Sequence, residues 1–168
     1  MNTNFLSAFV FLLEKEGGTN NSPTDRGGLT KFGISSKQYP DVDIANLTER
    51  QAAGIYYKDY WNLLSCSEFD RNLAIVLFDS GVNCGQPSAA IWLQKTLNLI
   101  AGAGLKVDGH IGPKTLAQAK LVSSDRLVVG IVAFRLKRYS RMLKNIPSQK
   151  TYIRGWIDRV AELIFYVL

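Results

Sequence analysis

The sequence predicts a mainly α-helical fold, with one short loop or β-hairpin segment near the N-terminus and a helical lobe at the C-terminus. Apolar residues recur three and four positions apart in most segments, which is typical of helices with one buried face. Residues 19–36 instead combine glycines with Asn, Ser, Pro and Asp and show no sustained period. At 168 residues, 46% of them hydrophobic and 20% charged, the chain is long enough to bury a core of its own.

The first helix is expected to run from about Phe5 to Glu16. Phe5, Phe9 and Leu12 recur at helical spacing, and a pair of glycines stops the pattern after Glu16. Glu16 follows Leu12 by four residues and therefore falls on the apolar stripe, whereas Glu14 points roughly the opposite way. One of two neighbouring glutamates is thus predicted to face inward.

Further helices are predicted along the rest of the chain. Thr48 is a good N-cap for a helix that continues towards Tyr60 and Trp61. The segment 152–168 is strongly apolar but contains four charged residues, which favours a packed last helix over a membrane span. The remaining helices are expected over residues 72–80, 88–97, 115–121 and 125–142.

The net charge of +6 is unevenly distributed. Residues 1–65 carry six Lys and Arg against seven Asp and Glu, whereas residues 123–168 carry nine against three. Arg135, Arg138 and Arg141 follow one another at intervals of three and are expected to form a basic stripe on the helix over residues 125–142. Such a stripe suits an anionic partner, and the alternative is an ordinary solvated helix face.

The two cysteines, Cys66 and Cys84, lack the spacing of metal ligands, and His110 is the only imidazole in the sequence. We therefore expect free thiols, no metal site and no cofactor. No Lys or Arg precedes the apolar segment 5–13, so it is interpreted as a core helix rather than a signal peptide.

Glu16 and Asp25 are candidates for the two carboxyl groups that glycoside hydrolysis commonly uses. Burial raises the pKa of a carboxyl group, and a glutamate at the end of an apolar stripe is placed to stay protonated as a general acid. Asp25 lies nine residues further on, in a polar loop where it would remain ionised. An inward glutamate can equally have a structural role.

Residues 11–34 contain F-L-L-E-K-E-G-G and then N-S-P-T-D-R-G-G-L-T-K-F-G-I. This pattern resembles the start of glycoside hydrolase family 108, a family of N-acetylmuramidases that includes phage endolysins. The resemblance implies a lysozyme-like helical domain in which the hairpin segment lines the active site and Glu16 is catalytic. Ser22 stands where the family commonly has aspartate, so Asp25 is the remaining loop acid. Thr30 falls one residue before the threonine of the phage-lysozyme pattern and is a candidate to hold the water or Asp25.

Residues 77–83, 90–97 and 107–116 look like the peptidoglycan-binding module that follows the catalytic part in this family. The string D-G-H-I-G-P-K-T at 108–115 predicts two tight turns around Ile111 and a helix that begins near Thr115. Residues 133–139 and 154–159 also fit the family's last segment. The resemblance implies a catalytic part at 1–65 and a peptidoglycan-binding-like part at 66–168, packed as one compact unit.

Four further side chains are candidates for binding the sugar. Tyr60, Trp61 and Trp156 could stack on the apolar faces of pyranose rings, and Asn83 could hydrogen-bond to the substrate. A role in the core is the alternative for each aromatic residue.

The sequence therefore predicts a lysozyme-type peptidoglycan hydrolase that cleaves between N-acetylmuramic acid and N-acetylglucosamine. The expected partner is bacterial peptidoglycan, with anionic lipid or lipopolysaccharide on the basic helices, and the expected state is a monomer that binds no nucleic acid. The resemblance implies synthesis in the host cytoplasm and action at the cell wall after release. Two alternatives remain: a non-catalytic wall-binding or secretion accessory protein, and a nucleic-acid binder that uses Arg135, Lys137, Arg138, Arg141 and Lys144.

Overall fold

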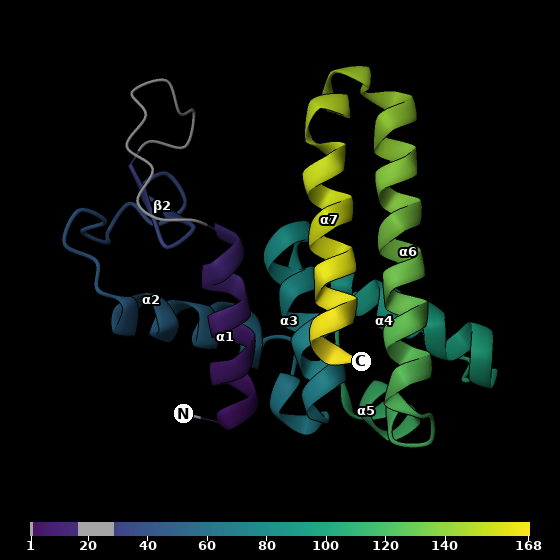
Figure 1. Ribbon diagram of the computed structural model, residues 1–168. Helices are drawn as coiled ribbons and strands as arrows, with labels where there is room; N and C mark the ends of the chain where they lie inside the picture. Colours follow the sequence, from purple (N-terminus) through teal and green to yellow (C-terminus); the bar gives the residue numbers. More distant parts are fainter. Residues whose placement is uncertain (1, 17–28) are drawn as a thin grey trace.

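The prediction of a mainly helical fold is confirmed. The computed structural model describes residues 2–16 and 29–168, and in the described part the only β-structure is one short hairpin (Figure 1). The helices are α1 (Thr3–Glu16), α2 (Glu49–Tyr56), α3 (Arg71–Cys84), α4 (Gln86–Ala101), α5 (Pro113–Ala119), α6 (Ser124–Asn145) and α7 (Lys150–Val167). A π-helical stretch (Tyr57–Asn62) continues α2, short 3-10 turns occupy Cys66–Glu68 and Pro147–Gln149, and the hairpin pairs β1 (Thr30–Lys31) with β2 (Ile34–Ser35).

The helix boundaries follow local signals in the sequence. Thr48 begins α2 as predicted: its side chain accepts a hydrogen bond from the backbone N–H of Gln51, and the Gln51 side chain accepts one from the N–H of Thr48. The helix expected over residues 72–80 continues to Cys84. Gly81 lies inside this helix, and the side chain of Leu64 occupies the space that a Cβ atom at Gly81 would need.

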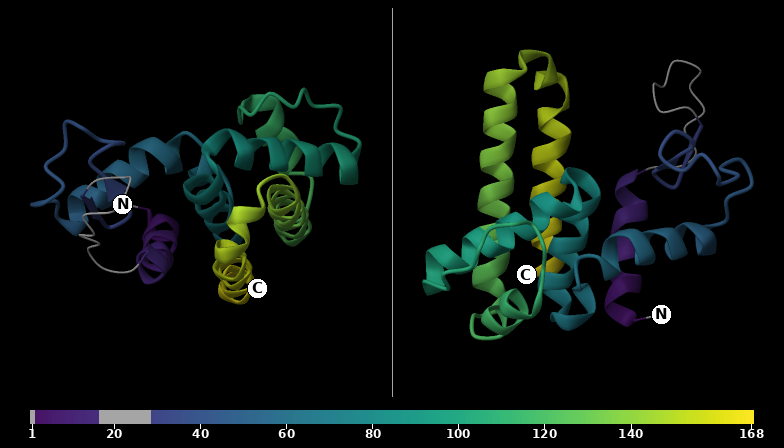
Figure 2. Two further views of the ribbon diagram at one scale, coloured as in Figure 1. Left: turned by 90° about the horizontal axis from the view of Figure 1, so that it is seen from above. Right: turned by 180° about the vertical axis from the view of Figure 1, so that it is seen from behind.

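Helix α3 lies at the centre of the molecule and packs against α1, α4, α6 and α7. Residues 73–81 are all buried, which accounts for a helix that is apolar on nearly every side. Helices α6 and α7 lie side by side and extend beyond the rest of the molecule (Figure 1). The hairpin lies at one end of the molecule and the loop before α5 at the other (Figure 2).

The predicted exposed stripe of Arg135, Arg138 and Arg141 is wrong in one member. Arg135 is fully buried, Arg138 is half-buried and Arg141 is exposed. The side of α6 that carries Arg135 faces α3, where Asp79 provides a carboxylate partner. The basic surface therefore consists of fewer residues than the spacing suggested.

Two smaller expectations concern the thiols and the apolar C-terminal segment. Cys66 and Cys84 are free, Cys66 fully and Cys84 partly buried. Burial raises the pKa of the Cys66 thiol well above its ordinary value. Among the described residues, no helix is long and apolar enough to cross a membrane.

Candidate active site

Helix α1 ends at Glu16, the first residue of the E-G-G motif in the sequence. The predicted apolar stripe is confirmed, since Phe5, Phe9 and Leu12 are at most 4% exposed, and Glu14 is exposed as expected. Glu16 is the last residue of the helix. Its side chain and the whole of Asp25 lie outside the described residues, so the catalytic pair stays a prediction.

Thr30 lies on the hairpin, on the side of the molecule where α1 ends (Figure 1). The hairpin reverses at Phe32 and Gly33, both with positive φ, and its partly buried Thr30 pairs with Ser35. The Tyr56 hydroxyl donates a hydrogen bond to the Phe32 carbonyl at 3.0 Å, which fixes the turn to α2. The hairpin is thus anchored to the helical core, and the catalytic role of Thr30 stays a prediction.

The structure gives Trp61 and Tyr60 core positions rather than exposed sugar platforms. Trp61 is fully buried, packs edge-on against Phe5 and Phe78, and donates from Nε1 to the Ser67 hydroxyl at 2.8 Å. Tyr60 is 8% exposed, and Gln38 donates a hydrogen bond to its hydroxyl group. Stacking on a sugar needs an exposed ring face, and the described structure offers none at Trp61.

Trp156 and Asn83 keep access to solvent. Trp156 is half-buried on α7, where its ring lies between those of Tyr139 (5.1 Å between centroids) and Tyr152 (6.3 Å). Asn83 lies in the last turn of α3, and its amide donates hydrogen bonds to the backbone carbonyl and Oδ1 of Asp79. Sugar binding by these two residues stays a prediction.

Sequence reasoning missed a buried charge cluster formed by Asp79, Arg135 and Arg159. Arg135 Nη1 donates to Asp79 Oδ2 at 2.6 Å, and Arg159 donates to Asp79 Oδ1 from Nε at 3.0 Å and from Nη2 at 2.8 Å. Arg135 also donates from Nε to the Tyr139 hydroxyl at 2.7 Å. A single aspartate inside the apolar run of α3 was the available signal, because a buried carboxylate requires a partner.

Burial by itself lowers the pKa of the Arg135 guanidinium, but the interactions with Asp79 and Tyr139 together outweigh burial and raise this pKa above the ordinary value. Burial also raises the pKa of the Tyr139 hydroxyl. The side chain of Asp79 is 2% exposed and that of Arg159 is 12% exposed, so Arg159 forms the outer side of the cluster.

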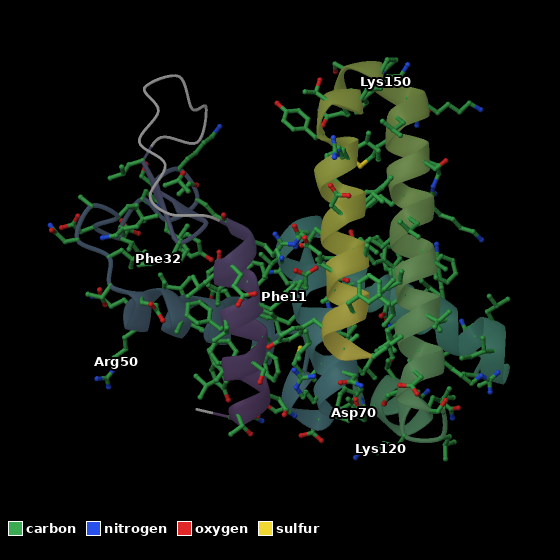
Figure 3. The ribbon with its side chains drawn as sticks, viewed as in Figure 1. Phe11, Phe32, Arg50, Asp70, Lys120 and Lys150 are labelled. Carbon is green, nitrogen blue, oxygen red and sulfur yellow. The ribbon has the colours of Figure 1, made fainter. Side chains whose placement is uncertain are left out.

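Helix α7 runs alongside α1. The rings of Phe11 and Tyr166 lie 5.0 Å apart, Tyr166 donates to the backbone carbonyl of Ser7, and Lys15 forms an ion pair with Glu162 at 2.5 Å. Figure 3 shows Phe11 on the side of α1 that faces α7. The last turn of α1, which ends at Glu16, is therefore held against the C-terminal helix.

The loop before α5 lies at the opposite end of the molecule from the hairpin (Figure 2). The Gln94 side chain donates to Asp108 Oδ1 and to the carbonyl of His110, and it accepts from the N–H of Gly109. These bonds hold the turns that the sequence predicts around Ile111, next to a cavity of about 830 Å³. No cluster of three or more His, Cys, Asp or Glu side chains suited to a metal occurs in the described parts of the chain.

The N-terminal half, which contains α1 and the hairpin, matches a known family. Residues 9–85 match the family model of glycosyl hydrolase 108. Residues 9–85 therefore form a glycosyl hydrolase 108 domain. Residues 88–161 match a second model, described as a predicted peptidoglycan domain. The two models meet between α3 and α4, and the division at residues 65 and 66 expected from the sequence stays a prediction.

The structure is similar to that of Brucella abortus SagA, with a TM-score of 0.78 and 28% sequence identity. The alignment covers 96% of this chain and 91% of SagA. No curated protein sequence matches the chain.

The charge cluster joins the two matched regions. Asp79 belongs to the glycosyl hydrolase 108 domain, whereas Arg135 and Arg159 belong to the peptidoglycan domain. The two matched regions are thus connected by buried ion pairs.

Proposed function

We propose that this glycoside hydrolase is an N-acetylmuramidase, which cleaves the β-1,4 bond between N-acetylmuramic acid and N-acetylglucosamine in peptidoglycan. The observation that carries the proposal is the glycosyl hydrolase 108 match over residues 9–85, together with the peptidoglycan domain that follows it. These matches support a peptidoglycan hydrolase, and the muramidase specificity and a phage endolysin role are the finer parts of the proposal.

In the proposed reaction, Glu16 protonates the oxygen of the scissile bond as the leaving group departs. Asp25 either activates water or stabilises the oxocarbenium-like centre, and Thr30 holds the water or Asp25. An acid at the end of an apolar stripe is kept protonated by the penalty on its charged form. No cofactor is required for this chemistry.

The neighbouring glutamates of α1 provide a matched test. Glu16→Gln should abolish the release of fragments from purified peptidoglycan, whereas Glu14→Gln, a change at an exposed position two residues earlier, should leave the rate unchanged. Mass analysis of the fragments should find new reducing ends on N-acetylmuramic acid. Reducing ends on N-acetylglucosamine would contradict the bond assignment, and full activity of Glu16→Gln would contradict the role of Glu16.

Two alternatives are tested in the same experiments. A non-catalytic wall-binding protein would bind peptidoglycan without releasing any reducing ends. A nucleic-acid binder would bind duplex DNA in a salt-sensitive way and leave peptidoglycan intact. The burial of Arg135 removes one of the cations that this second alternative relies on.

The proposal includes attachment to an anionic envelope through the C-terminal helices, with the enzyme acting as a monomer after release from the host cytoplasm. Exposed cations on α6 and at the start of α7 support it, and exposed Ile146 and Tyr152 lie near the same end of the helix pair. The exposed cations are Lys137, Arg141, Lys144, Lys150 and Arg154. We expect the protein to bind vesicles that contain anionic lipid and not to bind neutral vesicles.

A further inference from the structure

Two side chains of α4 hold the loop between α4 and α5 in one shape. Gln94 and Asn98 are four residues apart and therefore lie on the same face of the helix. Gln94 makes three hydrogen bonds to residues 108–110. The Asn98 amide donates to the carbonyl of Leu105 at 2.8 Å and accepts from its N–H at 2.7 Å. The loop is thus fixed at two places before any ligand binds.

This loop and α5 form a cavity of about 830 Å³, which we call the α5 cavity. It lies within the region that matches the peptidoglycan domain. Its volume falls in the range of roughly 300–1,000 Å³ that is typical of ligand sites. A wall that is already ordered by its own hydrogen bonds lowers the entropic cost of binding. The α5 cavity therefore has the size and the rigidity of a binding site.

The apolar lining of the α5 cavity suits small side chains rather than sugar rings. Among the residues that line it in the described structure, none is Phe, Tyr or Trp, the side chains on which a pyranose ring stacks. The wall is built from small or short residues instead, and methyl-sized groups fit against such a wall. These residues are Ala103, Gly104, Leu105, Gly112, Pro113 and Ala117.

The charged lining consists of two cations and one carboxylate. Lys106 comes from the loop and Lys114 from α5; both are exposed, and neither forms an ion pair with another described residue. Asp108 Oδ1 accepts hydrogen bonds from Gln94 and from the N–H of His110, and these bonds hold the pKa of Asp108 below its ordinary value. The cavity therefore favours a ligand with more carboxylates than ammonium groups.

We propose that the α5 cavity binds the stem peptide of peptidoglycan, with Lys106 and Lys114 holding its carboxylates. This inference rests on the proposed function, since it takes peptidoglycan as the polymer that the enzyme attacks. The stem peptide contains several alanines and carries more carboxylates than amines, which matches both the small wall and the excess of positive charge. The glycan strand offers mainly pyranose rings, for which the cavity has no stacking platform.

The position of the cavity defines what the bound peptide does. The loop before α5 and the hairpin lie at opposite ends of the molecule (Figure 2). A peptide in the α5 cavity therefore belongs to a different part of the polymer from the sugars at the hairpin. It holds the enzyme on the polymer and raises the local concentration of glycan, and it takes no part in bond cleavage.

The first experiment locates the ligand. Soluble stem pentapeptides without sugar, carrying either lysine or diaminopimelate at the third position, are added to the full-length protein, and the backbone amide signals are followed by NMR. The shifts should change mainly in residues 103–118, which include the lining of the α5 cavity. A soluble glycan fragment without peptide should leave these signals unchanged. Changes there with the glycan and not with either peptide would overturn the proposal, and so would no change with any ligand.

The second experiment tests the charges. Lys114→Gln should weaken peptide binding about tenfold or more, the effect of one lost charge-assisted hydrogen bond. Lys120→Gln is the matched control, because Lys120 directly follows α5, is exposed, lies outside the cavity lining and carries the same charge. It should bind the peptide as wild type does at the same ionic strength. Equal affinities of Lys114→Gln and Lys120→Gln would overturn the role of the lysines.

The third experiment fills the cavity. Ala117 is exposed on α5 and lines the cavity, so an indole at this position occupies the space without entering the core. Ala117→Trp should lose peptide binding and keep the melting temperature of the wild type. Unchanged affinity in this variant would overturn the placement of the peptide.

Failure of the proposed function can be distinguished from failure of this inference. The titration with free peptide measures binding alone and requires no cleavage. If Glu16→Gln keeps full activity on purified peptidoglycan, the proposed role of Glu16 fails and the titration still decides the role of the cavity. If the wild type cleaves peptide-free glycan strands but binds neither pentapeptide, the proposed function stands and the peptide site is refuted.

Discussion

Replacing Asp79 by asparagine should strongly destabilise the protein. Asparagine has nearly the same shape, but it carries no charge, and its NH2 group would point at one of the two guanidinium groups that now donate to the carboxylate. The Asp79 side chain is 2% exposed, so water cannot replace the lost interactions. The variant leaves Arg135 and Arg159 close together without their shared anion.

The size of the effect follows from this burial. Removing one partner of a buried ion pair costs about 3–5 kcal/mol, because the charge that remains is not compensated. For a chain of this size, each kcal/mol lowers the melting temperature by about 2–4 °C. Asp79→Asn should therefore melt about 6–20 °C below wild type.

Thermal unfolding followed by circular dichroism at pH 7 measures this difference, and urea unfolding gives the free energy independently. Asp158→Asn is the control, since it breaks the exposed pair with Arg154, in which the side chains are 93% and 60% exposed. An exposed pair contributes about 0–1 kcal/mol. If Asp79→Asn melts as close to wild type as Asp158→Asn does, the assignment of a stabilising buried charge cluster is refuted.

Two further predictions concern packing and thiol chemistry. Gly130→Ala should lower the melting temperature, because the added carbon would overlap the Thr96 side chain on α4. Gly54→Ala on α2 has open space around the added carbon and should stabilise the protein by about 0.5–1 kcal/mol. Thermal unfolding of the two variants tests both expectations. Burial raises the pKa of the Cys66 thiol, so at pH 8 this thiol should react with a thiol reagent far more slowly than that of partly buried Cys84. Cys66 should react fully only after denaturation. Equal reaction rates of the two cysteines in the native protein would contradict this prediction.

Much of the helical framework could be predicted because its determinants are local. The spacing of Phe5, Phe9 and Leu12 defines the buried face of α1, and the Thr48 cap defines the start of α2. The prediction ended α3 at residue 80, whereas the helix continues through Gly81 to Cys84. Leu64 packs where a side chain at Gly81 would lie, and no local pattern contains that contact.

The candidate site also has a part that the sequence predicts and a part that it does not. Its motif residues, Glu16, Asp25 and Thr30, follow from the sequence by resemblance, and their catalytic roles stay predictions. The periodicity of α6 gave Arg135 an exposed position, and the structure placed it inside, because its carboxylate partner Asp79 comes from 56 residues earlier in the chain.

The sequence by itself determined which segments are helical, where the hairpin lies and which family motif ends the first helix, because hydrophobic period, capping and motif spacing act over a few residues. Only the tertiary structure decided that Asp79, Arg135 and Arg159 meet in one buried cluster. These charges lie on three different helices, and a buried ion pair forms only where packing brings such helices together and excludes water.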